Sequence, residues 1–364
     1  LESLYNSALK IQTVQSEDNQ LRAAKQFEEL GTYKDSAERV QQCRDKAEEI
    51  RTEEERIKAE REKAEKERKA MLRRKNFKNN WEGYLYIAPW LIGFLLLQAW
   101  PMVYSIYLSF TDYSLFKEPN WVGLQNFKNI FTIDFTFKKS LLTTFKFVVL
   151  AVPLKLIFAL FVAMMLNKAV RGMSLYRTMV YLPSLLGGSV AIAVVWRNIF
   201  GLEGYVNTIL KALGFEAIPW LASTTWALPT LVLLNVWQFG SSMIIFLAGL
   251  KQIPASLYES AKVDGAGPIR SFIHITVPQL SPVVFFNLIY GMIGAFQQFN
   301  SAFLISNGGP AHSTYLYAMM LYEKAFTSYQ MGYAAALAWI LLAIVALFTG
   351  LNFILSKFWV HYDS

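Results

Sequence analysis

A short polar segment, residues 258–278, lies between two long apolar stretches and carries the side chains best suited to chemistry. Glu259 and Asp264 flank a stretch of helical spacing, and Gly265 permits a sharp turn because glycine adopts positive φ without a steric penalty. Pro268 suits the first position of a second short helix. An acid near a helix end is a good ion-pair partner. The pattern predicts a helix-turn-helix knuckle on which another molecule docks.

Motifs for catalysis are missing from the rest of the sequence. No Gly-x-x-x-x-Gly-Lys-Ser/Thr phosphate loop occurs, so we expect this chain neither to bind nor to hydrolyse ATP. The three histidines, His274, His312 and His361, are too far apart in sequence to form a ligand cluster. The single cysteine, Cys43, excludes an internal disulfide framework and is expected to be a reduced structural thiol. We therefore expect no enzyme, no metal site and no cofactor on this chain.

Charge divides the chain into two unlike parts. The protein has 364 residues, of which 54% are hydrophobic, with 35 Lys+Arg and 27 Asp+Glu. Residues 1–80 hold 19 of the basic and 17 of the acidic residues, and the remaining 284 residues hold only 26 charges. A bilayer requires such sparse charge. We predict a charged helical extension, residues 1–79, and a membrane domain, residues 80–364, whose polar loop is 251–279.

Apolar runs of about 20 residues, long enough to cross a bilayer as helices, occur six times. They are Tyr84–Phe110, Leu141–Leu166, Leu175–Phe200, Trp226–Leu250, Leu280–Ile305 and Gly332–Ser356. Tryptophans lie near the ends of these runs, where an interfacial aromatic belt would place them. The prediction is an all-α membrane protein with six transmembrane helices.

The basic residues indicate an orientation. The loops on the two sides carry equal numbers of Lys and Arg, so they do not decide it. A cluster just before the first span does, because the first helix usually dominates topology: it holds Arg68, Lys69, Arg73, Arg74, Lys75 and Lys78. Both termini are therefore expected in the cytoplasm. With an even number of spans, the 251–279 loop is expected there too.

The charged extension reads as helical throughout. A helix ending at Leu30, with Gly31 as a left-handed cap, is followed by a second helix from near Lys34. This hairpin resembles part of a tetratricopeptide repeat, but one partial repeat cannot bury its own face. From Cys43 to Lys75 the chain is charged and almost free of helix breakers, and its apolar heptad positions are only half filled. A single solvated helix is favoured over a coiled-coil dimer.

Polar side chains gather within the fourth and fifth predicted spans. Amides and hydroxyls offer both donors and acceptors, which suits a neutral, hydroxyl-rich ligand such as a sugar. Interhelical hydrogen bonding is the alternative explanation. The candidates for a substrate path are Asn235, Gln238, Asn287, Tyr290 and Gln297.

Lys155 lies near the middle of the second predicted span, just after Pro153. A cation there costs roughly 2.5–3.5 kcal/mol on insertion scales, and the predicted spans contain no Asp or Glu to pair with it. One interpretation is snorkelling or solvation by a carbonyl that the proline frees. The other is a pathway residue that favours acidic sugars.

Three ordered stretches carry a family resemblance. Glu259-Ser-Ala261 followed by Asp264-Gly-Ala266 resembles the signature cytoplasmic loop of ABC importer permeases. Two further pairs of motifs are similar to the carbohydrate subgroup: Ser109-Phe-Thr-Asp-Tyr with Trp121-Val-Gly-Leu-Gln-Asn-Phe, and Asn307-Gly-Gly-Pro-Ala-His-Ser-Thr with Met331-Gly-Tyr-Ala-Ala-Ala. Together they cover about residues 80–360, and they are similar to the larger rather than the smaller permease subunit of the maltose-transporter type.

The resemblance implies a bacterial inner-membrane, multi-pass permease subunit that imports a carbohydrate. Its implied partners are a second homologous permease, a dimer of ATPase subunits that carry ATP and Mg, an extracytoplasmic solute-binding protein and membrane lipid, with no nucleic acid. The resemblance assigns the ATPase-coupling role to Glu259, Ala261, Asp264, Gly265 and Ala266. In it Glu259 is the acid that pairs with a basic residue of the ATPase, and Gly265 makes the turn.

The sequence departs from the family pattern in three places: Ser260 stands where alanine is usual, Lys155 where a small residue is usual, and the charged extension is additional. Two alternatives stay open. One is import of another polar solute, such as a polyol or polyamine. The other is a membrane-anchored scaffold that acts through its charged helix.

Overall fold

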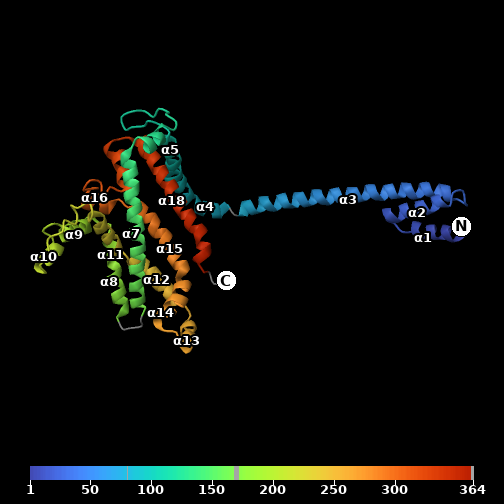
Figure 1. Ribbon diagram of the computed structural model, residues 1–364. Helices are drawn as coiled ribbons and strands as arrows, with labels where there is room; N and C mark the ends of the chain where they lie inside the picture. The colour runs from blue at the N-terminus through green and yellow to red at the C-terminus, as the bar shows by residue number, and fades with distance from the viewer. Residues whose placement is uncertain (80, 168–171, 362–364) are drawn as a thin grey trace. The chain divides into compact units, whose positions relative to one another are not determined.

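The structure, a computed structural model, describes residues 1–79, 81–167 and 172–361 (Figure 1). The described residues are organised as helices and connecting loops, with isolated β-bridges at Thr111–Trp121 and Ser114–Lys117. The chain divides into two compact units, Leu1–Gln98 and Ala99–Ser364. The predicted all-α fold is therefore confirmed.

The first unit contains α1 (Glu2–Gln12), α2 (Glu17–Glu29), α3 (Ser36–Asn79) and α4 (Trp81–Phe94). The Ser16 side chain accepts a hydrogen bond from the Asn19 amide at 3.4 Å and so caps the start of α2. After Leu30, which caps α2, Gly31 turns the chain with φ +58°. The predicted end of this helix at Leu30, with a left-handed glycine behind it, is confirmed.

Helix α1 is an addition to the predicted hairpin. The Tyr5 ring meets the Phe27 ring edge-on, with 5.7 Å between centroids. These rings bury a small apolar cluster together with Ala8, Ala23 and Cys43, which are fully buried. Burial raises the pKa of the Cys43 thiol, as fits a structural cysteine. Three helices therefore bury a face that the hairpin alone would have left open.

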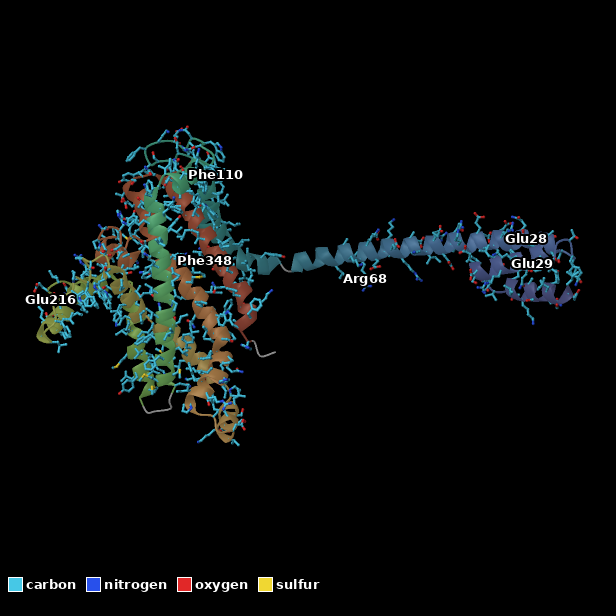
Figure 2. All side chains as sticks on the ribbon, in the orientation of Figure 1. Glu28, Glu29, Arg68, Phe110, Glu216 and Phe348 are labelled. Atoms are coloured by element: carbon cyan, nitrogen blue, oxygen red, sulfur yellow. The ribbon has the colours of Figure 1, made fainter. Side chains whose placement is uncertain are left out.

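Helix α3 is 44 residues long, so it spans about 66 Å at ~1.5 Å per residue. Residues 51–72 are exposed, and their side chains, Arg68 among them, project outward along the helix (Figure 2). Lys69 and Glu65 form an ion pair of 2.6 Å, worth a few tenths of a kcal/mol in an exposed i,i+4 pair. The predicted long helix is confirmed. In the basic cluster that set the orientation, the side chains of Arg73, Arg74, Lys75 and Lys78 lie outside the described residues.

The second unit contains the remaining helices. In chain order they are α5 (Trp100–Ser109), α6 (Gln125–Thr132), α7 (Phe135–Leu166), α8 (Met173–Leu186), α9 (Val190–Phe200), α10 (Tyr205–Ala212), α11 (Ala227–Trp237), α12 (Gly240–Gln252), α13 (Ala255–Val263), α14 (Pro268–Ser271), α15 (Val277–Phe296), α16 (Asn300–Ser306), α17 (Tyr317–Tyr322) and α18 (Met331–Trp359). Three π-helical turns interrupt the helices, namely η1 (Leu95–Ala99), η2 (Phe272–Thr276) and η3 (Glu323–Thr327).

Among the described residues, four continuous helices are long and apolar enough to cross a membrane: Gly83–Ser109, Phe135–Leu166, Pro268–Phe296 and Met331–Trp359. Two further spans are bent pairs. Helix α8 meets the segment Val190–Ala212 at 96°, and α11 meets α12 at 46°. Counting each bent pair once gives the six predicted spans.

Besides Trp226–Leu250, which bends between α11 and α12, two predicted spans differ in detail from the structure. The span Leu175–Phe200 is broken, because Gly187 and Gly188 weaken the helix and Ser189 leaves it with ψ 152° to cap α9. The helix of the predicted span Leu280–Ile305 begins and ends earlier in the chain than predicted. It already begins at Pro268 and ends at Phe296, and α16 starts separately at Asn300.

Helix α15 contains a proline that a hydroxyl offsets. Pro282 has no N–H to donate to the carbonyl of Pro278, four residues earlier. The Ser281 hydroxyl donates to that carbonyl instead, at 2.6 Å. The same hydroxyl accepts a hydrogen bond from the His361 amide at 2.8 Å. A serine beside a proline thus satisfies the helix and fastens the C-terminal end of the chain.

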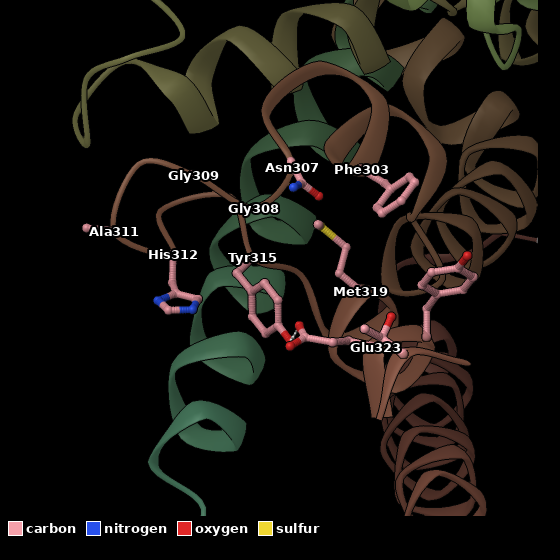
Figure 3. A pocket seen from close by; sticks show the side chains of 11 residues that line it. Phe303, Asn307, Gly308, Gly309, Ala311, His312, Tyr315, Met319 and Glu323 are labelled. Carbon is pink, nitrogen blue, oxygen red and sulfur yellow. Dashed lines mark hydrogen bonds between the residues drawn. The ribbon is translucent and has the colours of Figure 1, made fainter. Parts of the chain in front are cut away.

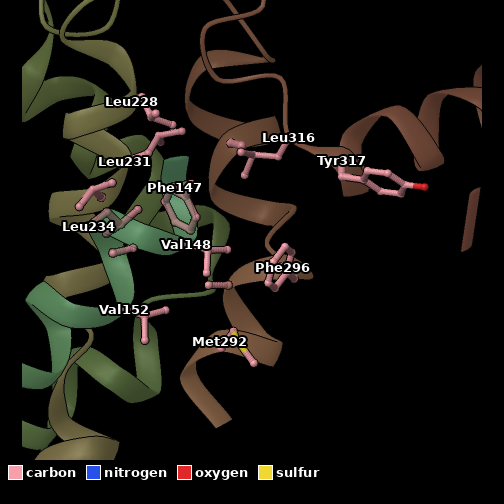
Figure 4. Close-up of a cluster of buried hydrophobic side chains, with 14 of the residues drawn as sticks. Phe147, Val148, Val152, Leu228, Leu231, Leu234, Met292, Phe296, Leu316 and Tyr317 are labelled. Atoms are coloured by element: carbon pink, nitrogen blue, oxygen red, sulfur yellow. The ribbon is translucent and has the colours of Figure 1, made fainter. Parts of the chain in front are cut away.

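Helix α7 lies in the middle of the second unit and packs against α11, α12 and α15. Phe147, Val148 and Val152 of α7 meet apolar side chains of α11 and α15 in the buried cluster (Figure 4). Small residues bring the helices close together, as is usual in membrane bundles. A Cβ added to Gly249 of α12 would lie 2.9 Å from the Val283 side chain of α15.

Two motif pairs contact each other at one end of the second unit and form a joint between its helices. One pair follows the first span, and the other precedes the last span. The buried Asn126 amide donates to the carbonyls of Ser109 and Thr111, at 2.9 and 2.8 Å. Gly332, at the start of α18, packs so tightly that a Cβ there would lie 2.2 Å from the Thr111 carbonyl oxygen. Its amide donates to the Tyr113 carbonyl at 2.9 Å. These motif residues hold the architecture together.

Candidate functional site

Helix α13 forms one arm of the knuckle, at the opposite end of the second unit from the 110–124 segment (Figure 1). It ends in a Schellman motif, with the Ala266 amide donating to the Ala261 carbonyl at 2.8 Å and the Gly265 amide to the Lys262 carbonyl at 3.2 Å. Gly265 has φ +73°. Asp264 is the helix C-cap. Four of the five predicted coupling residues, all but Glu259, therefore form or border this turn.

The second arm joins the knuckle to a span. Pro268 opens the four-residue α14, which continues through η2 into α15. The hydroxyls of Tyr258 in α13 and Thr276 in η2 are hydrogen-bonded at 2.9 Å. Thr276 is buried, with 5% of its surface exposed. The bond therefore links α13 to the turn from which the α15 span begins.

The outer surface of the knuckle mixes charge and apolar side chains. Glu259 and Asp264 are exposed, and neither makes an ion pair with any residue that the structure describes. Val263 is 88% exposed and Ile269 is 76% exposed. A free acid beside two protruding apolar side chains has the composition of a protein contact, in which buried apolar area is combined with charge pairing.

Behind the knuckle lies a cavity of about 550 Å³, bounded by the end of α7, by α12 and by both arms. Tyr258 and Thr276 line it with Met164, Asn167 and Phe272. The knuckle is therefore supported through Tyr258 and Thr276 while space remains beneath it.

The predicted path residues Asn235 and Gln238 lie beside the bend between α11 and α12. The Gln238 amide donates to the Gly187 carbonyl at 3.0 Å. A Cβ on Gly187 would lie 2.2 Å from the Gln238 side chain, so Gln238 packs directly on the break between α8 and α9. Asn235 is half-buried one turn earlier. Gln238 thus links the two bent spans to each other.

Three further candidates lie within α15 or at its end, and their surroundings differ. Asn287 is 1% exposed, and its amide donates to the Val283 carbonyl at 3.0 Å while its Oδ1 has no partner among the described residues. Tyr290 is 68% exposed. Gln297 is exposed and caps the end of α15. The structure does not gather these side chains into one pocket.

Lys155 is half-buried on α7, on the same face as the buried residues Ala151, Val152 and Ala159. It makes no hydrogen bond or ion pair with another residue in the described part of the chain. Gly291 of α15 packs against Val152, since a Cβ there would lie 3.4 Å from the valine. Lys155 therefore lies on the face of α7 that packs against the other helices of the bundle.

A model of the family described as "Binding-protein-dependent transport system inner membrane component" matches residues 136–360. The chain belongs to this family. It is a permease component of a binding-protein-dependent transporter and lies in the inner membrane. The prediction of a transport subunit rather than an enzyme agrees with this membership.

Relatives of this permease cover most of it. YesP of Bacillus subtilis, named a probable ABC transporter permease protein, is 52% identical over 290 residues, which are 79% of this chain and 94% of YesP. The lactose transport system permease protein LacF of Rhizobium radiobacter is 32% identical over 298 residues, 79% of this chain and 99% of LacF. About a fifth of the permease therefore lies outside either match.

A solved structure shows the same fold. It is a bacterial ABC transporter involved in the import of the acidic polysaccharide alginate, and one of its chains superimposes with a TM-score of 0.68 at 24% identity. The match covers 78% of this permease and 97% of that chain. The superposition shows that the fold of this permease is one already seen in a solved transporter chain.

At the other end of the permease, acids have partners that sequence patterns did not reveal. Asp134 caps α7 by accepting from the Thr136 amide at 2.9 Å, accepts from the Tyr333 hydroxyl at 2.8 Å and lies 3.8 Å from the Lys324 ammonium. Nearby, Tyr315 donates to Glu323 at 2.5 Å across a cleft of about 610 Å³ (Figure 3). Burial and this carboxylate raise the pKa of Tyr315.

Proposed function

We propose that this chain is the transmembrane permease subunit of an ATP-driven ABC importer that translocates a carbohydrate delivered by an extracytoplasmic binding protein. Family membership supports the transport role, and the lactose permease LacF supports a carbohydrate solute. The single observation that carries the mechanism is the knuckle, where an exposed acid that pairs with no described residue lies on a helix hydrogen-bonded to the start of a span.

The ATPase is the expected occupant of that surface. Glu259 would pair with a basic residue of a separate ATPase chain, while Val263 and Ile269 would be covered by its groove. A charge-assisted hydrogen bond is roughly twice as strong as a neutral one and fixes geometry as well. The Schellman turn at Gly265 holds the acid at a defined place, so a movement of the ATPase would be transmitted to α13.

From α13 the movement would pass through the Tyr258–Thr276 hydrogen bond into α15. Helix α15 packs against α7 and α12, and α12 is the second half of a bent span. The importer would then alternate between inward- and outward-facing states around a solute site near the membrane midplane. We place the candidate path residues Gln238, Asn287, Gln297, Asn235, Tyr290 and Lys155 along this route, with Gln238 also holding the two bends together.

The proposed assembly contains a second homologous permease, two ATPase subunits that bind ATP and Mg, and the solute-binding protein. Both termini of this chain would be cytoplasmic, which puts the knuckle on the side of the ATPases. The charged α3 would then extend on that side as well. The solute itself, whether a neutral sugar, an acidic sugar or another polyol, is set mainly by the binding protein.

Reversal of one charge tests this function. Glu259→Lys should abolish solute uptake by the purified complex in proteoliposomes, while ATP hydrolysis no longer responds to the loaded binding protein. Glu216→Lys, which reverses an exposed acid in the loop after α10, is the matched control and should leave both activities intact. Normal uptake by the Glu259→Lys complex would rule out the coupling assignment.

A further inference from the structure

The outer surface of α7 carries a groove of about 800 Å³ that the import mechanism does not use. It lies between α7, the beginning of α11 and the loop before α17. Its polar lining consists of Lys139, Lys146, Thr143, Thr224, Thr225, His312 and Ser313, and its apolar lining of Leu142, Phe145, Val149, Leu150, Leu228, Pro229 and Ala311. The described lining thus contains two lysines and no carboxylate.

The two lysines lie on one side of the helix. Seven residues, just under two turns, separate Lys139 from Lys146, so their side chains leave the same face of α7. The Lys139 ammonium donates to the Ala311 carbonyl at 2.6 Å. Lys146 is exposed and makes no ion pair with a described residue, although it lies inside the apolar run Leu141–Leu166. An intramembrane cation is stabilised by an anion, a backbone carbonyl or water, and Lys139 already has its carbonyl.

The two acidic residues that lie near the groove residues in sequence already have hydrogen-bond or ion-pair partners. Asp134, at the start of α7, holds the Lys324 ammonium and the Tyr333 hydroxyl. Glu323 accepts from Tyr315 in the neighbouring cleft, which shares His312 with the groove. Neither carboxylate is free to neutralise Lys146, so an anion that pairs with it would come from another molecule.

The apolar surface next to the lysines indicates which kind of anionic molecule fits the groove. Below Lys146 the same side of α7 continues as an exposed apolar stripe through Leu154, Ile157 and Phe161, which are 48%, 66% and 58% exposed. A hydrated oligosaccharide has no apolar chain to cover such a stripe. A helix of another protein would have to bury both lysines, which is costly unless acids accompany it.

We propose that this groove is a binding site for an anionic phospholipid. The phosphate would lie between the Lys139 and Lys146 ammonium groups, the hydroxyls of Thr224 and Thr225 would bind the head group, and an acyl chain would follow the apolar stripe. Basic pockets between transmembrane helices on the cytoplasmic side recognise anionic lipid head groups in this manner. This groove, at the end of the unit opposite the knuckle (Figure 1), would do so in the other leaflet. The site is separate from the knuckle, so its test does not depend on whether the proposed coupling role is correct.

The experiment titrates delipidated, purified complex with short-chain phosphatidylglycerol or phosphatidylcholine and counts bound lipids by native mass spectrometry. The permease should prefer phosphatidylglycerol. Each lysine near a surface contributes about five-fold to the affinity for anionic lipid, so Lys139→Gln combined with Lys146→Gln should reduce the preference about 30-fold. Lys138→Gln, an exposed neighbour in α7 that does not line the groove, should retain the full preference.

Three outcomes would overturn the proposal. The first is an unchanged preference in the double variant. The second is displacement of phosphatidylglycerol by a galacturonate trisaccharide, which would make the groove a site for acidic sugars. The third is loss of the second permease from the double variant at an unchanged lipid count, which would make the groove a subunit interface. Thermal melting in phosphatidylcholine checks that each variant is folded.

Discussion

The two ends of the permease unit use acidic residues in opposite ways. At the end that holds the start of α7, Asp134 and Glu323 are each engaged by tyrosine hydroxyls, and Asp134 also caps a helix and faces Lys324. At the knuckle, Glu259 and Asp264 are exposed and pair with no residue in the described part of the chain. One set holds the subunit together, and the other is available to a partner.

This difference separates two kinds of mutational effect. Changes at the Asp134 end should lower stability without a specific effect on coupling. Changes at the knuckle should alter coupling and leave the subunit folded. For each variant, both the Tm and the uptake per ATP hydrolysed therefore need to be measured.

The largest effect on stability is expected for Gly332→Ala, because the new Cβ would lie 2.2 Å from a backbone oxygen that cannot move aside easily. Overpacking costs about 1–3 kcal/mol and occasionally more, so we expect a much reduced yield of folded complex and a lower Tm. Gly350→Ala is the control in the same helix, since no atom lies within 4 Å of its Cβ. Equal Tm values for the two variants would contradict the joint at Thr111.

Asp134→Ala should be the next most destabilising change. It removes a helix cap, a tyrosine hydrogen bond and an ion pair at once, for a loss of roughly 2–3 kcal/mol. Thermal unfolding followed by fluorescence-detected size exclusion measures it. Glu259→Ala serves as the comparison and should leave the Tm unchanged. A similar fall in Tm for both would remove the distinction between the two ends.

At the knuckle, Gly265→Ala should cost about 1–2 kcal/mol, because alanine is strained at φ +73°. Gly267→Ala is a matched control two residues away, with φ −73° and no atom within 4 Å of its Cβ. We expect reduced uptake per ATP hydrolysed for Gly265→Ala only. Equal uptake by the two variants would show that the Schellman turn has no part in coupling.

The smallest effect is expected for Tyr258→Phe, which removes one hydrogen bond worth about 1 kcal/mol. The fold should persist, but the link between α13 and α15 is weakened. The ratio of ATP hydrolysed to solute imported should therefore rise while the Tm stays within a few degrees. Tyr205→Phe, at an exposed tyrosine at the start of α10, is the control. A ratio equal to that of the unmodified complex would exclude transmission through Tyr258 and Thr276.

The sequence predicted what depends on local pattern. Apolar run length gave the six spans, and glycine and proline placement gave the turn at Gly265 and the start of α14. Contacts between residues far apart in the chain could not be predicted from local pattern. The Gln238–Gly187 bond joins residues 51 apart, and the Asp134–Tyr333 bond joins residues 199 apart. Asn126 and Gly332 were visible as motif residues, but only the structure shows that they form a joint.

The central claim is that Glu259 meets an ATPase subunit, and site-directed cross-linking tests it most directly. The chain has one cysteine, the buried Cys43, so Cys43→Ser gives a background for single-cysteine variants. In membranes that contain the whole complex, Glu259→Cys with a short photoactivatable cross-linker should capture the ATPase chain, and Glu216→Cys should not. Failure of the Glu259→Cys variant to capture the ATPase, or equal capture by the Glu216→Cys variant, would contradict the account.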